Sequence, residues 1–191
     1  GGLPGRPPSR VVEVNYFGPV ELLDGLRDAL ARGTAPAAVA IASNSTTIYP
    51  GLPVALVDAC LADDAPEAHR LADEVGPIAT YPATKTAVCR WARRQATSPA
   101  WVGAGVRLNA VAPGMVETPL LAEQRTDGQI APLLDALPIP LGRPGTPDEV
   151  AAVVAFLLSP ESSLLCGTIV LADGGTEALL RPDAYPGIWE P

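Results

Sequence analysis

The sequence predicts an α/β fold in which about three parallel strands are connected by crossover helices. The almost wholly apolar run at 37–43 has the composition of a parallel strand that is buried on both faces. Residues 106–113 and 168–175 are predicted to be the other two strands, and the last of these ends in a glycine turn. Longer segments with helical patterns separate these runs, so helix and strand alternate along the chain. In a parallel sheet the carboxyl ends of the strands share one edge, where α/β proteins bind their ligands.

The first half of the chain contains the earliest predicted elements. Residues 10–32 have the pattern of an amphipathic helix with Gly18-Pro19 in its interior, and AAVAIAS at 37–43 follows as a strand. We expect residues 46–79 to be an inserted segment, irregular apart from helical pieces at 53–62 and 65–75.

The second half contains a helix, two strands and another helix. We predict a helix from about residue 80 to 97, with TYPATK near its start, and a strand at 106–113. Thr146-Pro147-Asp148-Glu149 has the pattern of a capping box with proline at the first helical position, which predicts a helix at 147–158. After the 168–175 strand, the tail at 180–191 has no clear periodicity.

Composition limits the possible partners. The 191 residues are 48% hydrophobic, enough for one domain with a sizeable core, and no apolar run approaches the roughly 18 residues of a membrane span. The net charge of −8 argues against nucleic acid or an anionic membrane as partner. Cys60, Cys89 and Cys166 have no metal-ligand spacing and are expected to be free thiols in a reducing cytoplasm. The single histidine, His69, argues against a histidine-based metal site or a Ser-His-Asp triad.

Tyr81 and Lys85 are the first candidate catalytic pair. They lie four residues apart in TYPATK, so a helix places them on one face. The chain has twelve arginines and only this lysine, which suggests that Lys85 occupies a position that arginine cannot fill. An ammonium beside a phenol favours the phenolate and lowers the phenol pKa, most effectively in a partly buried site with a second positive charge. An ordinary surface pair is the alternative interpretation.

Ser43 and Asn15 are the other candidates. Ser43 ends the 37–43 strand at the ligand-binding edge, where its hydroxyl could bind a substrate oxygen; ordinary turn chemistry is the alternative. Pro19 cannot supply the N–H that the Asn15 carbonyl accepts in a regular helix. We predict that this carbonyl binds an ordered water in a proton path, and a simple kink is the alternative.

Taken together, the segments VNYFG, IASNS, YPATK, RLNAVAPGMVETP and IVLADGG resemble the second half of a short-chain dehydrogenase/reductase. The resemblance implies a Rossmann-like doubly wound parallel sheet, of which this chain supplies the C-terminal part. It also implies that Tyr81 is the general acid/base, that Lys85 lowers the Tyr81 pKa and binds the nicotinamide ribose, and that Ser43 orients the substrate. Asn15 would hold, through its main-chain carbonyl, the water that links Lys85 to solvent.

The resemblance also implies a nicotinamide cofactor. Pro113, Gly114, Val116 and Thr118 match the segment that contacts the nicotinamide and its carboxamide, with NAD expected and NADP as the alternative. Ser43 and Tyr81 are 38 positions apart, farther than in most members of the family. This long insertion resembles the bacterial 3α-hydroxysteroid dehydrogenase/carbonyl reductase type, which implies oxidation or reduction of a steroid or another bulky apolar alcohol or ketone. A homodimer or homotetramer is implied for the full-length protein.

The sequence departs from the family pattern at its start. The TGxxxGxG phosphate loop is missing from these 191 residues, and we expect a single partial domain that is truncated at its N-terminus. The 37–43 strand would then be an apolar sheet edge. A catalytically inactive dinucleotide-fold remnant that acts as an interaction module is the alternative to an enzyme.

Overall fold

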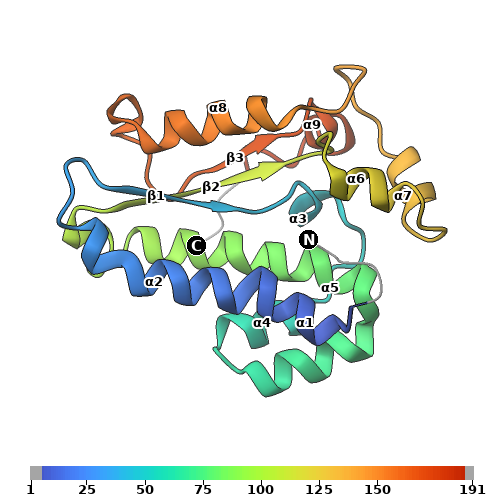
Figure 1. Cartoon of the computed structure of the whole chain (residues 1–191), viewed down its shortest axis with the longest axis horizontal. Helices are drawn as coiled ribbons and strands as arrows, with labels where there is room; N and C mark the ends of the chain where they lie inside the picture. Colours follow the sequence, from blue (N-terminus) through green and yellow to red (C-terminus); the bar gives the residue numbers. More distant parts are fainter. Residues whose placement is uncertain (1–5, 188–191) are drawn as a thin grey trace.

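The computed structural model describes residues 6–187 and contains a parallel sheet in the order β1-β2-β3 (Figure 1). The strands are β1 (Ala37–Ile41), β2 (Arg107–Pro113) and β3 (Ile169–Ala172). Ala37 pairs with Arg107 and Ile41 with Val111, and on the other side of β2 Pro113 pairs with Ala172. The predicted α/β fold with three parallel strands is therefore confirmed.

The first helical segment contains a widened turn beside the proline. α1 (Pro8–Val12), the π-helical turn η1 (Glu13–Phe17) and α2 (Gly18–Leu30) follow one another without a break. In η1 the N–H of Gly18 donates to the carbonyl of Glu13, five residues earlier. The helix thus accommodates Pro19 by a local change of hydrogen-bond register, a feature that is frequent at functional sites.

The inserted segment forms helices close to where the sequence predicts them. α3 (Ser45–Ile48) and α4 (Val54–Leu61) precede the long α5 (Ala65–Ala96). Gly76, with φ of 79°, divides α5 into two helices, because its left-handed backbone interrupts the helical path. The second of these begins at Pro77 rather than near Thr80, so TYPATK lies one turn inside it. Pro82 is consequently within the helix.

The C-terminal part returns to the sheet. The helices are α6 (Pro119–Gln124), α7 (Ala131–Asp135), α8 (Pro147–Leu158) and α9 (Thr176–Leu180), with short 3₁₀ turns at Val102–Ala104 and Pro160–Ser162. The predicted capping box is present: Thr146 Oγ1 accepts from the Glu149 N–H at 3.3 Å, and Glu149 accepts from the Thr146 N–H at 2.8 Å. α8 therefore begins and ends where the sequence predicts.

The helices form unequal layers on the two faces of the sheet. α2, α4 and α5 lie below the strands in Figure 1, and α8 lies above them. The main core fills the lower interface, where Ala83, Ala87 and Trp91 of α5 pack with Leu108 and Ala110 of β2. This packing fixes α5, and with it Tyr81 and Lys85, against the sheet.

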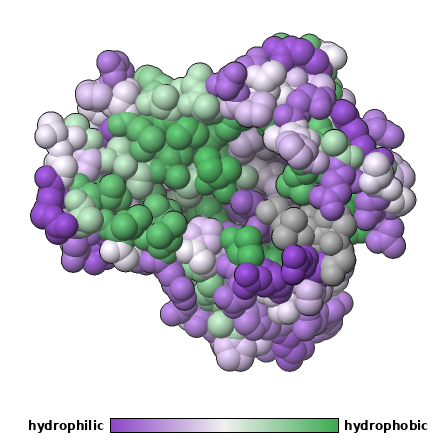
Figure 2. Space-filling view, in the orientation of Figure 1, coloured by the Kyte–Doolittle hydropathy of each residue, from purple (hydrophilic) through white to green (hydrophobic). Residues whose placement is uncertain are grey.

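β1 is the edge of the sheet among the described residues, as expected, since it pairs only with β2. Figure 2 shows a broad apolar area in the region of β1, α8 and α2. Large exposed apolar side chains on these elements include Leu22, Leu26, Ile41 and Phe156. An apolar sheet edge of this kind favours contact with another polypeptide segment.

The C-terminal end of the chain is described as far as residue 187. α9 ends at Leu180, the first residue of the predicted irregular tail. Residues 181–187 contain neither helix nor strand, and residues 188–191 of the tail lie outside the described residues. The division into one partial domain with an insertion stays a prediction. In the part of the chain that the structure describes, no helix has the length and hydropathy needed to span a bilayer.

Candidate active site

A cavity of about 830 Å³ opens at the carboxyl ends of β1 and β2. It contains most of the residues that the sequence selects, which come from β1, α5 and the segment after β2. They are Ser43, Tyr81, Lys85, Pro113, Gly114, Val116 and Thr118. The fold therefore brings together in one cavity groups that are as far as 75 positions apart in the sequence.

Ser43 lies two residues beyond the end of β1 and is buried, with 8% of its surface exposed. Its Oγ accepts a hydrogen bond from the backbone N–H of Ser45 at 3.2 Å, because the chain turns here into α3. The Ser43 hydroxyl also forms a hydrogen bond with the Tyr81 side chain, which lowers the pKa of Tyr81. Ser43 thus combines a turn-forming role with a contact to the candidate acid/base.

Burial has the largest effect on Tyr81. It raises the pKa of the phenol above its ordinary value of 10.0, and the hydrogen bond from Ser43 only partly opposes this. The lowering of this pKa that was expected from Lys85 is not among the effects that act on the phenol. The physical reason is that desolvation disfavours the phenolate, while the ammonium is engaged elsewhere.

Lys85 donates from Nζ to the backbone carbonyl of Ile41 at 2.9 Å. Burial lowers the pKa of its ammonium below 10.5, and Cys89, one turn further along α5, opposes this. A lysine that is tied to the strand end and partly desolvated releases its proton more readily than one in water. This is the property expected of a lysine that takes part in proton transfer.

Asn15 does not line the cavity. It is 2% exposed and contacts α5, where its Nδ2 donates to Thr84 Oγ1 at 3.3 Å. Thr84 immediately precedes Lys85, so the π-helical turn is attached to the part of α5 that carries the candidate lysine. The predicted water on the Asn15 carbonyl stays a prediction.

The segment after β2 forms the opposite side of the cavity. Pro113 ends the strand, and Gly114, Val116 and Thr118 follow it into α6. Thr118 is the N-cap of α6, since its Oγ1 accepts from the Leu121 N–H at 3.2 Å and also donates to the Val116 carbonyl at 3.3 Å. Its hydroxyl therefore stabilises the turn, in addition to any contact with a ligand.

Sequence reasoning missed the apolar wall of the cavity. The wall comes from the insertion and from the region of α6 and α7, and consists mainly of Ile48, Tyr49, Pro77, Ile78, Leu120, Leu121, Ile130, Leu133, Leu134 and Leu137. The leucines between residues 120 and 137 are visible in the sequence, but only the tertiary structure places them opposite the insertion. The cavity can thus hold a ligand with a large apolar surface.

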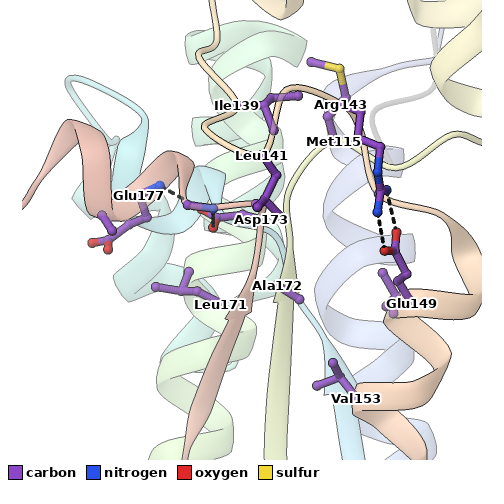
Figure 3. A pocket seen from close by; sticks show the side chains of 15 residues that line it. Met115, Ile139, Leu141, Arg143, Glu149, Val153, Leu171, Ala172, Asp173 and Glu177 are labelled. Atoms are coloured by element: carbon purple, nitrogen blue, oxygen red, sulfur yellow. Dashed lines mark hydrogen bonds and ion pairs between the residues drawn. The ribbon is translucent and has the colours of Figure 1, made fainter.

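Asn44 and Asp173 were also missed. Asn44 lines the cavity next to Ser43, whereas Asp173 lines a second cavity of about 430 Å³ between β3, α8 and the 139–145 loop (Figure 3). Figure 3 shows the Arg143–Glu149 ion pair across this second cavity from Asp173. Asp173 directly follows β3, which was the available signal for a residue at the ligand-binding edge.

The arrangement supports proton transfer to or from a hydroxyl or carbonyl oxygen. A partly buried phenol, a serine hydroxyl and a desolvated lysine converge on one cavity with an apolar wall. Within residues 6–187, no group of three or more His, Cys, Asp or Glu side chains is placed to hold a metal ion. The candidate groups for proton transfer are Ser43, Tyr81 and Lys85.

Comparison with known proteins identifies enzymes that are similar to this chain in sequence. A family model described as enoyl-(acyl carrier protein) reductase matches residues 68–177. The 3-alpha-hydroxysteroid dehydrogenase/carbonyl reductase of Comamonas testosteroni is 39% identical over 180 residues, which are 92% of this chain and 68% of that enzyme. Galactitol 2-dehydrogenase of Rhizobium johnstonii is 40% identical over 99 residues, or 52% of this chain and 37% of that enzyme.

A solved structure agrees with these matches. The 3-alpha-hydroxysteroid dehydrogenase from Pseudomonas sp. B-0831, complexed with NADH, superposes with a TM-score of 0.89 and 44% identity. The superposition covers 95% of this chain and 71% of that structure. The similarity thus extends over nearly all of this chain, which spans about two thirds of the two hydroxysteroid dehydrogenases and a smaller part of the galactitol enzyme.

Proposed function

This chain belongs to the short-chain dehydrogenase/reductase family, and we propose that the protein that contains it is an NAD(P)-dependent oxidoreductase. The reaction is hydride transfer between a nicotinamide cofactor and a secondary alcohol or ketone. The observation that carries the proposal is the convergence of Ser43, Tyr81 and Lys85 on one cavity.

Tyr81 is the proposed acid/base. In reduction its phenol, which burial keeps protonated, donates a proton to the carbonyl oxygen of the substrate. The Ser43 hydroxyl, held by the Ser45 N–H, orients the same oxygen. Lys85 returns a proton to Tyr81, since burial lowers the pKa of its ammonium. Asn15, whose side chain donates to Thr84 next to Lys85, is proposed to hold the water that connects this lysine to solvent.

The residues present fit the nicotinamide half of the cofactor. Lys85 and Tyr81 on one side would hold the ribose, and Pro113, Gly114, Val116 and Thr118 on the other would hold the ring and its carboxamide. When bound, the nicotinamide supplies or accepts the hydride. Gly114 lines the cavity at the carboxyl end of β2, next to Pro113. We propose NAD as the cofactor because the Pseudomonas structure was solved with NADH; NADP is the alternative.

The substrate is proposed to be a steroid or another bulky apolar alcohol or ketone. The support is the wall of aliphatic side chains from the insertion and α6–α7, together with the hydroxysteroid dehydrogenases among the relatives. The galactitol enzyme matches only about half of this chain. The elements that distinguish an apolar from a polar substrate are expected to include the insertion, because Ile48, Pro77 and Ile78 line the cavity.

Two experiments test the proposal. Titration with NADH, followed by nicotinamide fluorescence, should show saturable binding to the protein that carries these residues. Turnover should then be faster with a 3-hydroxysteroid than with a polyol such as galactitol. No NADH binding and no turnover with either class would contradict the enzyme proposal and favour a non-catalytic interaction module. Faster turnover of the polyol would contradict only the substrate class.

Localisation, partners and assembly are also proposals. A soluble cytoplasmic enzyme without a nucleic-acid or membrane partner is consistent with the net charge of −8. Assembly into a homodimer or homotetramer is proposed for the protein that contains this chain. Sedimentation of that protein would measure its assembly, and a monomer at micromolar concentration would contradict it.

A further inference from the structure

One side-chain hydrogen bond connects the two outer strands of the sheet. Asn44 Nδ2 donates to Asp173 Oδ2 at 3.3 Å, although the two residues are 129 positions apart in the sequence. Asn44 follows β1 and Asp173 follows β3, and these strands are separated by β2. The bond therefore crosses the carboxyl end of β2, beside the segment that lines the active-site cavity.

Asp173 is held rigidly at its own end of this connection. Its Oδ1 accepts from the Gly175 N–H at 3.0 Å, and its Oδ2 accepts from the Glu177 N–H at 2.8 Å (Figure 3). The carboxylate is thus fixed by the turn that leads into α9. Asn44 thus donates to the Asp173 carboxylate, which the backbone of residues 175–177 already holds in place.

Gly114 permits the crossing. A Cβ at this position would lie 2.7 Å from both Cα and Cβ of Asp173, which is too close for any other residue without a shift of backbone. The Gly114 N–H donates to the Ala172 carbonyl at 3.0 Å, and the Asn44 N–H donates to the Pro113 carbonyl at 2.9 Å. The three strand ends are consequently joined by both backbone and side-chain hydrogen bonds.

Asn44 transmits this constraint to Ser43. It is 6% exposed, immediately follows the catalytic serine, and its carbonyl accepts from Thr47 Oγ1 at 3.0 Å and the Ile48 N–H at 3.3 Å. The turn that directs the Ser43 hydroxyl toward Tyr81 is therefore fixed through Asn44. Loss of the side-chain bond would leave this turn attached to β2 only by its backbone.

We propose that Asp173, acting through the Asn44 side chain, is a positioning residue for the reaction. It fixes Ser43, which follows β1, relative to the Gly114–Thr118 segment, which follows β2, so that the proton-transfer groups and the nicotinamide-binding segment keep one relative geometry. The proposal rests on the proposed function. Small displacements of catalytic groups reduce the rate of the chemical step, on the order of 100-fold for about 1 Å.

The test compares substitutions at both ends of the bond. Asn44→Ala removes the bond and leaves the backbone contacts of Asp173 intact. Asn44→Asp places two carboxylates together, and the exchange Asn44→Asp with Asp173→Asn restores a donor and an acceptor. Asp24→Asn is the matched control, because Asp24 accepts from Trp101 Nε1 at the same 3.3 Å, at a site far along α2.

We expect kcat to fall about 10- to 100-fold in Asn44→Ala and Asn44→Asp, with KM for NADH changed by less than about threefold. The exchange variant should recover most of kcat, even though the amide introduced by Asp173→Asn can accept only one of the two backbone N–H groups. Asp24→Asn should keep full kcat. Unchanged kcat in Asn44→Ala, or an exchange variant no faster than Asn44→Asp, would overturn the positioning role.

Amide hydrogen exchange separates this inference from the proposed function. Peptides that cover residues 43–48 should exchange faster in Asn44→Ala and Asn44→Asp and regain protection in the exchange variant, while peptides of β1 stay protected. This result supports the connection even if the protein lacks turnover, in which case only the proposed function fails. Equal protection of residues 43–48 in all variants would overturn the inference, whatever the activity.

Discussion

The Nζ of Lys85 lies 2.9 Å from the backbone carbonyl oxygen of Ile41 and donates a hydrogen bond to the last residue of β1. The same ammonium lies one helical turn from Tyr81, yet it is burial that determines the pKa of the phenol, in the upward direction. A lysine bonded to a strand end is positioned before any ligand arrives. Its effect on Tyr81 then depends on how a bound ribose and the nicotinamide charge change this contact.

Lys85→Met is expected to change the pH dependence of stability. Because burial lowers the pKa of Lys85 in the folded protein, the unfolded chain binds more protons between that pKa and 10.5. This difference in proton binding therefore makes the wild-type protein more stable as the pH rises from the pKa of folded Lys85 to 10.5. The melting temperature of the variant relative to wild type should fall as pH rises toward 10.5, as measured by calorimetry.

Arg93→Met, on the exposed side of the same helix, is the control for Lys85→Met. Its melting temperature relative to wild type should be constant over the same pH range, because arginine stays charged. A pH-independent difference for Lys85→Met would contradict the lowered pKa.

Tyr81→Phe is expected to abolish turnover and leave cofactor binding measurable. Removal of a general acid/base reduces rates by about 10²- to 10⁴-fold. The substitution keeps the ring that lines the cavity and leaves Lys85 to hold the ribose, so NADH binding should still be detected by fluorescence. Tyr185→Phe, at an 83% exposed position, should retain full activity. Unchanged turnover in Tyr81→Phe would remove this residue from the mechanism.

Gly114→Ala is expected to destabilise the protein and reduce its activity. The new methyl group would lie 2.7 Å from the Asp173 Cα, and relief of this contact must move the ends of β2 and β3 apart. Overpacking of this kind costs about 1–3 kcal/mol of unfolding free energy. Denaturation in urea measures the loss.

Gly25→Ala is the matched control for Gly114→Ala. Its methyl group would meet nothing within 4 Å in the interior of α2, and alanine favours the helix by about 1 kcal/mol. We therefore expect the free energy of unfolding to rise in this variant. Equal stability of the two alanine variants would show that the strand ends are not closely packed.

Glu149→Gln is expected to reduce stability at neutral pH but not in strong acid. Hydrogen bonds from Arg143 lower the pKa of Glu149 to about 2, with a further contribution from Thr146. A depressed pKa stabilises the fold above pH 4.5, and this stabilisation is lost as pH falls toward 2. The wild type should melt above the variant at pH 6, and the two melting temperatures should converge near pH 2. Asp148→Asn is the neighbouring control, and a gap that persists at pH 2 would contradict the assignment.

Local rules made most of the fold predictable. Strands form within the predicted segments 37–43, 106–113 and 168–175, at Ala37–Ile41, Arg107–Pro113 and Ile169–Ala172. Thr146 starts α8 because the capping box satisfies the first free N–H groups of a helix. The predicted start of the helix that contains Tyr81 was wrong because of Gly76. A glycine in a left-handed conformation and a following proline shift that start by one turn, and the periodicity of apolar residues does not reveal this.

The sequence by itself determined which groups are candidates for catalysis: one lysine four residues after a tyrosine, a serine at a strand end, and an asparagine four residues before a proline. Only the tertiary structure decided their electrostatics, because burial, which raises the pKa of Tyr81 and lowers that of Lys85, depends on what packs around α5. It also decided the partnership of Asn44 with Asp173. No local pattern joins residues 129 positions apart, and only the parallel sheet places the ends of their strands on either side of Gly114.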